Sequence, residues 1–492
     1  MFLNLHCATL GIMNNSEEYE GRKHDVKTPD ALAEFMSRGW LPTPLEGVTP
    51  IESLSFFVSR REKLSKQYQG IRLIIPSGGL KVRSNDTDFR FRPHSEFIWL
   101  TGISASDAAP DSVLILEPEG DSHQALLFVR PRDSREEDEG FYRDARYGEF
   151  WVGRRLTLDE TSKRYCMEAR HIESLSDFLA NTCETFALRG LNEVVDEKVE
   201  KRKKKDAELA SILSAMRLIK DGYEVAEMQK AINSTLRGFA DMVRVFPAAI
   251  GVKRGERIIE SAFFGRARLE GNDLGYQTIA ASGSHACVLH WVRNDGEVKP
   301  GELILIDAGI EIDSFYTADI TRTLPINGKF SPAQRKLYML LLDAQRAAMA
   351  MVKPGVKFRD VNKAAQEVLA KGFEEMGVLP ISAEESMKPE NGLHRRWSLH
   401  GTSHMVGLDV HDCAQARDDQ YIDGVLEAGM ILTVEPGLYI QPDDELFPPE
   451  FRGIGIRIED DVLVTETGHR NLSAALPSHP DEIEVWMTNL LR

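Results

Sequence analysis

Residues 303–309 read LILIDAG, and residues 453–462 read GIGIRIEDDV. The first stretch is an apolar run that ends at Asp307, and the second alternates isoleucine with a glycine, Arg457 and Glu459. In an extended strand this alternation puts the isoleucines on one face and the cation and carboxylate together on the other. Carboxylates beside such apolar runs are costly unless they are paired or ligated. Both stretches therefore predict strands that bring acidic side chains to a buried site.

Three further segments carry candidate chemistry: YTADITRTLP (316–325) with Asp319, LTVEPGLYI (432–440) with Glu435, and HGTSHMVGLDVHD (400–412) with three histidines. Taken singly, each has an ordinary explanation, such as a turn-forming aspartate or two unrelated histidines without the H-E-x-x-H pattern of a zinc helix. Taken together, four carboxylates and an imidazole supply enough ligands for two divalent cations and a bridging water. We therefore predict a metal site.

The composition is that of a globular protein with an acidic balance. The 492 residues contain 60 Lys plus Arg against 77 Asp plus Glu, a formal charge of −17. The length predicts two to four domains. The negative charge argues against a nucleic-acid partner. The basic run at 201–205 is flanked by acidic residues and is interpreted as a solvated helix that links two domains.

Nothing in the sequence favours export or a membrane. Residues 1–13 are apolar but lack a basic region, which argues against a signal peptide. Residues 274–292 carry no formal charge, yet they hold too many polar groups to be buried in lipid. The five cysteines are odd in number and never form a C-x-x-C pair, as expected for a reducing compartment. We expect a cytoplasmic protein with no membrane partner.

Strand and helix patterns divide the chain in two. The first 45 residues show no sustained period, and we expect at most one helix there. A helix at 51–68, another at 172–182 and short strands between them indicate a small α/β domain; the predicted strands are 72–76, 96–101, 112–116 and 125–129. Residues 196–218 are rich in helix-forming residues.

After residue 220 the pattern changes to helix pair, strands, helix pair, strands. The predicted helices are 224–245, 256–267, 331–352 and 358–376. The strand-like segments are 276–292, 302–323, 430–440 and 454–465. This order indicates an α+β fold with a duplicated architecture, although no residue-level repeat is evident.

From about residue 220 the sequence resembles the pita-bread metallopeptidases, within them the aminopeptidase P and prolidase group. The matching segments are IDAG, DITRTLPINGKFS, HGTSHMVGLDVHD, TVEPGLYI and GIGIRIEDDV. FRFRPHSEFIWLTG (89–102), LLFVRPRD and FWVGRRL resemble the N-terminal domain of the aminopeptidase P branch. The resemblance implies a pita-bread catalytic domain, with pseudo-twofold αα-β halves around a curved antiparallel sheet, after a smaller α/β domain. We expect an extension at 1–45, a creatinase-like α/β domain at 46–195, a helical linker at 196–219 and the catalytic domain at 220–492.

Carried over residue by residue, the resemblance implies a dinuclear centre. Its ligands would be Asp307, Asp319, His404, Glu435 and Glu459, with Asp319 and Glu459 bridging the two ions. Three histidines would line the site (His290, His400 and His411), and Tyr439 and Arg457 would lie behind the ligands. Oxygen donors with a single imidazole favour two Mn²⁺ ions, with Co²⁺ or Zn²⁺ as alternatives.

The implied activity is release of the N-terminal residue from peptides whose second residue is proline, through attack of a hydroxide bridging the two metals. Glu435 would carry the proton to the departing nitrogen. A prolidase restricted to dipeptides would use the same site, and the N-terminal match favours the aminopeptidase. The 200 residues before the catalytic domain argue against a methionine aminopeptidase. The complete ligand set argues against a creatinase-type hydrolase and against a non-catalytic binding relative. The family resemblance also implies a homodimer or homotetramer.

Overall fold

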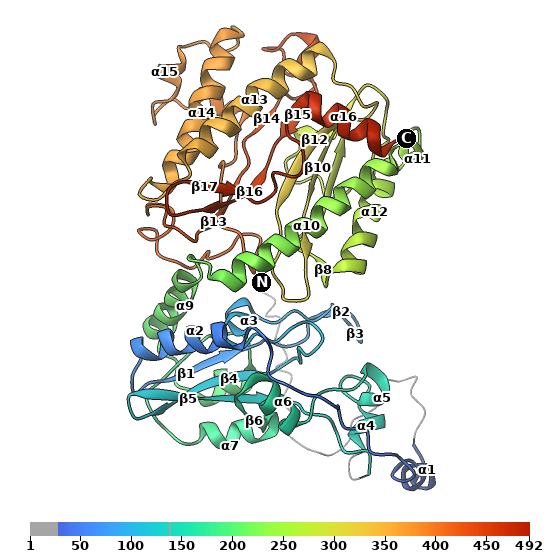
Figure 1. Cartoon of the computed structure of the whole chain (residues 1–492), viewed down its shortest axis with the longest axis vertical. Coiled ribbons are helices and arrows are strands. Elements are labelled where there is room, and N and C mark those ends of the chain that lie inside the picture. The colour runs from blue at the N-terminus through green and yellow to red at the C-terminus, as the bar shows by residue number, and fades with distance from the viewer. Residues whose placement is uncertain (1–27, 137–138) are drawn as a thin grey trace, which may run out of the picture.

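The computed structural model describes residues 28–136 and 139–492. An N-terminal and a larger C-terminal part follow each other along the long axis of the molecule (Figure 1). Helices and sheets occur in both parts, so the predicted α+β class is confirmed. The predicted extension lies outside the described residues up to position 27, as does Cys7, and its described remainder holds one helix, α1 (Asp30–Met36).

The N-terminal part is built on a mixed five-stranded sheet in the order β6-β5-β4-β1-β7. The strands are β1 (Arg72–Pro76), β4 (Val113–Glu119), β5 (Ser122–Val129), β6 (Glu168–His171) and β7 (Thr185–Ala187), with a separate hairpin of β2 (Val82–Ser84) and β3 (Thr87–Asp88). The helices are α2 (Leu54–Gln67), α3 (Ser95–Thr101), α4 (Gly140–Arg143), α5 (Glu149–Val152), α6 (Leu158–Tyr165), α7 (Leu175–Leu179) and α8 (Glu193–Lys198). Strand β1 is antiparallel to β4 and parallel to β7, so the carboxyl ends of β1 and β7 meet at one edge.

The predicted strand at 96–101 is wrong, because this segment forms the helix α3. Every residue of α3 is buried, so its apolar run has no polar face from which a period could be recognised. The helix ends at Gly102, whose φ of 73° and N–H bond to the Ile98 carbonyl form a left-handed cap. A short, fully buried helix and a buried strand give the same sequence pattern.

The connecting helix α9 (Lys203–Met216) is more than a solvated linker. Leu209 and Leu213 are buried, and Asp206 accepts hydrogen bonds from the Ala187 backbone N–H and from Arg189. The helix therefore packs against the end of β7 with one face, whereas the basic residues 201–205 remain largely exposed, as predicted.

The C-terminal part repeats one arrangement, a helix pair followed by antiparallel strands. The first half contains α10 (Gly222–Arg244), α11 (Phe246–Ala249), α12 (Gly255–Glu270), β8 (Asp273–Leu274), β9 (Ile279–Ser282), β10 (Leu303–Ala308), β11 (Ile310–Glu311) and β12 (Ile320–Pro325). The second contains α13 (Pro332–Met351), α14 (Phe358–Glu375), α15 (Ala383–Ser386), β13 (Ile431–Val434), β14 (Gly437–Tyr439), β15 (Gly455–Arg457), β16 (Asp460–Val464) and β17 (His469–Asn471). Helix α16 (Pro480–Leu490) follows them. The sheets β12-β10-β9 and β13-β16-β17 form the centre of the two halves.

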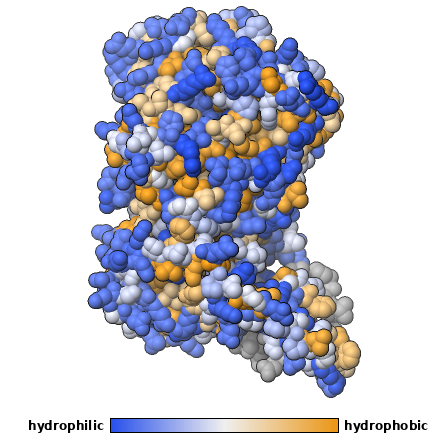
Figure 2. Space-filling model, in the orientation of Figure 1, coloured by the Kyte–Doolittle hydropathy of each residue, from blue (hydrophilic) through white to orange (hydrophobic). Residues whose placement is uncertain are grey.

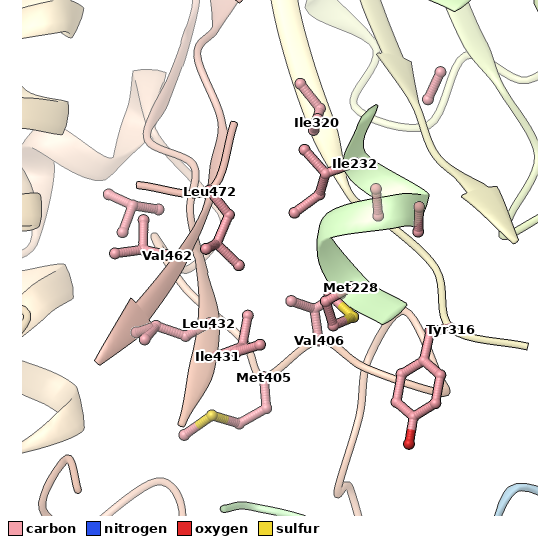
Figure 3. Packing of buried hydrophobic residues seen from close by; sticks show 14 of the residues in the cluster. Met228, Ile232, Tyr316, Ile320, Met405, Val406, Ile431, Leu432, Val462 and Leu472 are labelled. Atoms are coloured by element: carbon pink, nitrogen blue, oxygen red, sulfur yellow. The ribbon is translucent and has the colours of Figure 1, made fainter. Parts of the chain in front are cut away.

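The first helix of each pair begins at a capping box: Asp221 with Glu224 before α10, and Ser331 with Gln334 before α13. Their apolar faces are packed in one core that both halves share. Figure 3 shows Met228 and Ile232 of α10 on one side of this core and Leu432 of β13 and Val462 of β16 on the other, with Leu472 and Ile431 between them. This shared core fixes the strand ends of the two halves relative to each other.

The strand-like segments are shorter than predicted. Segment 276–292 contains only β9, after which Gly283 at φ 56° starts a 3₁₀ helix. Segment 430–440 is divided into β13 and β14 around Pro436, which has no N–H to donate to a ladder. These interruptions are where candidate site residues leave the sheets. Within the described residues, no helix is both long and apolar enough to cross a bilayer. On the face shown in Figure 2, apolar side chains are interspersed among polar ones.

Candidate metal centre

A cavity of about 550 Å³ lies where strand ends of the two halves meet. Asp307 lies near the end of β10, and Asp319 directly precedes β12, the partner of β10. Glu435 follows β13 and Glu459 precedes β16, and the last register pair of these strands is Val434 with Asp460. The structure thus brings all four predicted carboxylates to one cavity, together with His404 from the loop before β13.

The imidazole of His404 lies between two of the carboxylates. Its Nε2 is 3.3 Å from Asp319 Oδ2 and 3.3 Å from Glu435 Oε1. One ligand atom each from Asp319, His404 and Glu459 lie within 4.8 Å of one another. Ligands bonded to one cation at about 2.0–2.6 Å are separated by about 4–5 Å at most, so this spacing fits a metal ion.

The cluster contains several carboxylates close together and too little positive charge to neutralise them. Burial, with the nearby charge of Asp307, raises the pKa of Asp319 to about 6 in spite of the hydrogen bond with His404. Burial and the charge of Asp319 raise the pKa of Glu459 well above its usual value. Burial would also raise the pKa of Glu435, but the hydrogen bond and charge of His404 lower it to about 2. Crowded carboxylates retain protons at a higher pH than isolated ones because their negative charges repel each other. Bound divalent cations would neutralise these charges.

A chain of hydrogen bonds holds Asp307 from behind. Arg457 donates from Nη2 to Asp307 Oδ2 at 2.6 Å and from Nη1 to the Tyr439 hydroxyl at 2.8 Å. The Tyr439 oxygen is in turn 2.7 Å from His400 Nε2. Arg457 and His400 line the cavity, and Tyr439 is connected to it by its hydrogen bonds with these two residues.

The other two predicted histidines line the same cavity. The His411 ring packs edge-on against His404, with centroids 4.4 Å apart. Burial, with the charge of His404, lowers the pKa of His411, which favours its neutral form. His290 lies in the loop after the 3₁₀ helix and is exposed.

One buried carboxylate fixes the loop of His290. Glu256 of α12 accepts four hydrogen bonds, from the backbone N–H groups of Ser282 (2.8 Å) and Gly296 (2.6 Å), from His285 Nδ1 (2.8 Å) and from Trp291 Nε1 (2.9 Å). The His285 and Trp291 rings are stacked 3.9 Å apart. Glu256 thus ties together both ends of the segment that carries His290.

The sequence analysis missed three residues of the site. The Tyr276 hydroxyl lies 2.6 Å from Asp307 Oδ1 and 2.5 Å from Asp319 Oδ1, and Thr321 Oγ1 donates to Glu459 Oε2 at 2.6 Å. Thr321 shares a strand face with Asp319 two residues away, which was a usable signal. Asp461 is buried and accepts the Asp319 backbone N–H at 3.1 Å, but nothing in the sequence distinguished it from its acidic neighbours.

Comparison with known proteins gives two family matches. The model of metallopeptidase family M24 matches residues 226–466, and that of the aminopeptidase P N-terminal domain matches residues 57–187. Among curated relatives, Xaa-Pro aminopeptidase 1 of Streptomyces coelicolor is 49% identical over 464 residues, covering 94% of this chain and 92% of its own length. Xaa-Pro aminopeptidase of Escherichia coli is 32% identical over 457 residues, covering 88% and 97%.

Solved structures are similar over the same span. Zinc-substituted E. coli aminopeptidase P in complex with product has a TM-score of 0.78 and 32% identity, covering 90% of this chain and all of that one (100%). Proline aminopeptidase P II from Yersinia pestis has a TM-score of 0.77 and 32% identity, covering 89% and 99%. The similarity therefore includes both the N-terminal sheet and the duplicated C-terminal part.

Proposed function

The chain belongs to metallopeptidase family M24, in its aminopeptidase P branch, and we propose that it is an Xaa-Pro aminopeptidase. It is a hydrolase that releases the N-terminal residue from peptides whose second residue is proline. The observation that carries the proposal is the meeting of Asp307, Asp319, His404, Glu435 and Glu459 in one cavity. A non-catalytic relative would be expected to have lost members of this set.

The five residues would hold two divalent cations, and Asp319 and Glu459 would be shared between them. The donor set is four carboxylates and one imidazole, which suits a hard or borderline cation, so Mn²⁺ is proposed ahead of Co²⁺ and Zn²⁺. The crowding that raises the pKa values of Asp319 and Glu459 supports this assignment, because bound cations would relieve it. The metal pair, when bound, supplies Lewis acidity and a water of lowered pKa as the nucleophile.

The remaining steps are assigned to side chains. Glu435 accepts the proton released by the nucleophile and delivers it to the departing proline nitrogen. His290 or His411 donates a hydrogen bond to the oxygen on which negative charge develops. Arg457 and Tyr276 keep Asp307 in a fixed orientation through bonds of 2.6 Å each.

Proline selectivity follows from the chemistry of the substrate. A prolyl nitrogen carries no hydrogen and its ring fixes φ, so peptidases that need an N–H contact at this position fail. A cavity lined by Leu289, Val292 and Ile279 beside the carboxylates offers apolar surface for such a ring.

The test is hydrolysis of Xaa-Pro peptides with and without a chelator. We expect cleavage between the first residue and proline, its loss after exhaustive metal removal, and its return with Mn²⁺. Full activity in a demetallated preparation would overturn the mechanism. A dipeptide and a tripeptide with the same first residue separate the two enzyme classes, since a prolidase would cleave only the dipeptide.

Three further properties are proposed with the activity. The division into domains at 46–195 and 220–492, joined by 196–219, is supported by the separate sheets of the two parts. A homodimer or homotetramer formed partly by the N-terminal domain is supported by Phe150, Trp151 and Val152, which are 65%, 55% and 56% exposed, and ultracentrifugation tests it. A cytoplasmic location is supported by Cys166 and Cys183, which are exposed and unpaired.

A further inference from the structure

A second and larger cavity, of about 900 Å³, lies between the N-terminal and C-terminal parts. One wall is formed beyond the ends of the parallel strands β1 and β7, by residues 77–81, 190–194 and 196. The other is formed by C-terminal residues that include Asp409, Cys413 and His411. His411 lines both this interdomain cavity and the cavity of the metal centre, so the two cavities adjoin at this residue.

The basic residues of the interdomain cavity fall into two groups. Arg92 and Arg217 are engaged by carboxylates of the domain interface: Arg92 Nε is 2.5 Å from Glu311 Oε2, and Arg217 Nη1 is 2.8 Å from Glu96 Oε1. Lys81, Arg130 and Arg146 are not part of that interface network. Within the described part of the chain, Lys81 and Arg130 form no ion pair, and Arg146 has one contact of 3.5 Å with Asp88.

Arg130 and Arg146 are held against the same aromatic ring. Their guanidinium carbons lie 4.6 Å and 5.6 Å from the centroid of Tyr147. The Tyr147 hydroxyl donates to Asp111 Oδ2 at 2.9 Å, so this carboxylate already has a hydrogen-bond partner. Within the described residues, Glu193 of helix α8 also lines the cavity without an ion pair, and Asp196 has one contact of 3.9 Å with Arg189. Two oriented guanidinium groups with little neutralisation favour a planar anion, and a carboxylate fits their fork geometry.

We propose that the interdomain cavity binds the part of the peptide that follows the scissile proline, and that Arg130 and Arg146 recognise a carboxylate carried there. The carboxylate is either the C-terminus of a short peptide or an acidic side chain of a longer one. This inference rests on the proposed function. It identifies the N-terminal part of the chain as the determinant of which peptides are preferred.

The relative size of the two cavities supports this direction of binding. Upstream of the scissile bond an aminopeptidase of this kind holds a single residue, whereas downstream it must hold a chain of varying length. The metal-centre cavity, at about 550 Å³, is the smaller, and the interdomain cavity, at about 900 Å³, adjoins it at His411. A peptide that runs from the metal centre past His411 would reach the interdomain cavity, because His411 borders both cavities.

The experiment compares matched peptides that share the sequence Ala-Pro-Ala. One pair differs only in a free or amidated C-terminus, and a second pair, both longer and amidated, carries Glu or Gln downstream of proline. The ratio of kcat/KM within each pair is measured for the wild-type protein, Arg130→Gln, Arg146→Gln and the double variant. Arg143→Gln is the matched control, since Arg143 is in the same part of the chain, pairs with Glu139 and does not line the cavity.

We expect the wild-type protein to prefer the carboxylate member of at least one pair by about tenfold, through KM, as a charge-assisted hydrogen bond would give. Each single variant should reduce that ratio, the double variant should bring it to about one, and Arg143→Gln should leave it unchanged. The pair that shows the preference identifies the source of the carboxylate. Ratios are insensitive to the fraction of folded enzyme.

Equal ratios in the wild-type protein and the double variant would overturn the inference while leaving the proposed function intact. A wild-type protein that cleaves no Xaa-Pro peptide would instead overturn the proposed function itself. A wild-type preference for the amide or for Gln would also contradict the role of the two arginines.

Discussion

Two buried clusters of charge lie close together in this molecule, and they are opposite in character. At the domain interface, Arg217 Nη1 lies 2.8 Å from Glu96, its Nη2 contacts both Asp409 and Asp412, and Lys220 Nζ lies 2.6 Å from Asp412. At the metal centre, four carboxylates have Arg457 and His404 as their cationic neighbours, because burial lowers the pKa values of His400 and His411. The first cluster is close to electrically balanced and the second is not.

The pKa values express the difference. At the interface, burial would raise the pKa of Glu96, but the charge of Arg217 lowers it to about 2, and Arg217 and Lys220 likewise lower that of Asp412. At the metal centre, burial and neighbouring acids raise the pKa values of Asp319 and Glu459. Burial is similar in both clusters, but the carboxylates of the domain interface are ionised, whereas those of the metal centre tend to retain protons unless cations bind.

Asp319→Asn tests the unbalanced cluster and has the largest expected effect. Activity should fall at least about a hundredfold, since even partners behind a ligand cost that much, and less than two metal ions per chain should be retained. In the chelated protein the same variant should melt at a higher temperature than wild type. The reason is that an aspartate with a folded pKa of about 6, above its unfolded value of about 3.9, opposes folding at neutral pH.

Elemental analysis and melting curves with and without chelator measure these effects. Asp313→Asn, at an exposed position on the preceding loop, is the control and should change neither. A destabilised chelated Asp319→Asn protein would show that the metal centre is balanced after all.

Arg217→Met tests the balanced cluster. Removal of the guanidinium leaves Glu96 and Asp412 buried with too little positive charge, and we expect unfolding in urea to show a loss of about 3–5 kcal/mol. Arg244→Met is the control, because Arg244 is 52% exposed and pairs with Asp241 on the surface, where a loss of at most about 1 kcal/mol is expected. Similar losses in both variants would contradict the distinction between buried and surface pairs.

The loss of stability at low pH tests the same cluster and has a smaller expected effect. Glu96 has a folded pKa of about 2 against an unfolded value of about 4.3, so it stabilises the protein above pH 4.3, and this contribution is lost as the pH falls towards 2. Wild type should therefore lose about 3 kcal/mol more than Glu96→Gln between pH 5 and pH 2. Denaturant unfolding at several pH values measures it, and Glu390→Gln, at an exposed position, should follow wild type.

Glu256→Gln has the smallest expected effect, because Glu256 is satisfied by four hydrogen-bond donors rather than by cations. The amide keeps the shape but turns one acceptor into a donor, which should loosen the loop of His290. We expect kcat to fall about tenfold with KM nearly unchanged, and Glu256→Ala to fall further. Glu260→Gln on the same helix is the control, and an unchanged kcat in Glu256→Gln would remove the proposed positioning role.

The predictability of each element depended on where its determining contacts lie. Helices α10 and α13 were predictable because their capping boxes and apolar periods are local in the sequence. Helix α3 was not, because a run that is buried on every side has no period that distinguishes a helix from a strand. The residues that meet at the metal centre followed from apolar runs ending in acids and from the family resemblance.

The sequence by itself determined which residues are acidic, apolar and helix-forming. It therefore determined the α+β class and the set of carboxylates that could bind a cation. Only the tertiary structure decided that Tyr276 and Thr321 bond to those carboxylates, that Arg217 balances one acidic cluster but not the other, and that His411 and Arg130 line one cavity. Charge balance depends on distances of a few ångströms between residues far apart in the chain, and such distances exist only once the two halves and the N-terminal sheet have packed together.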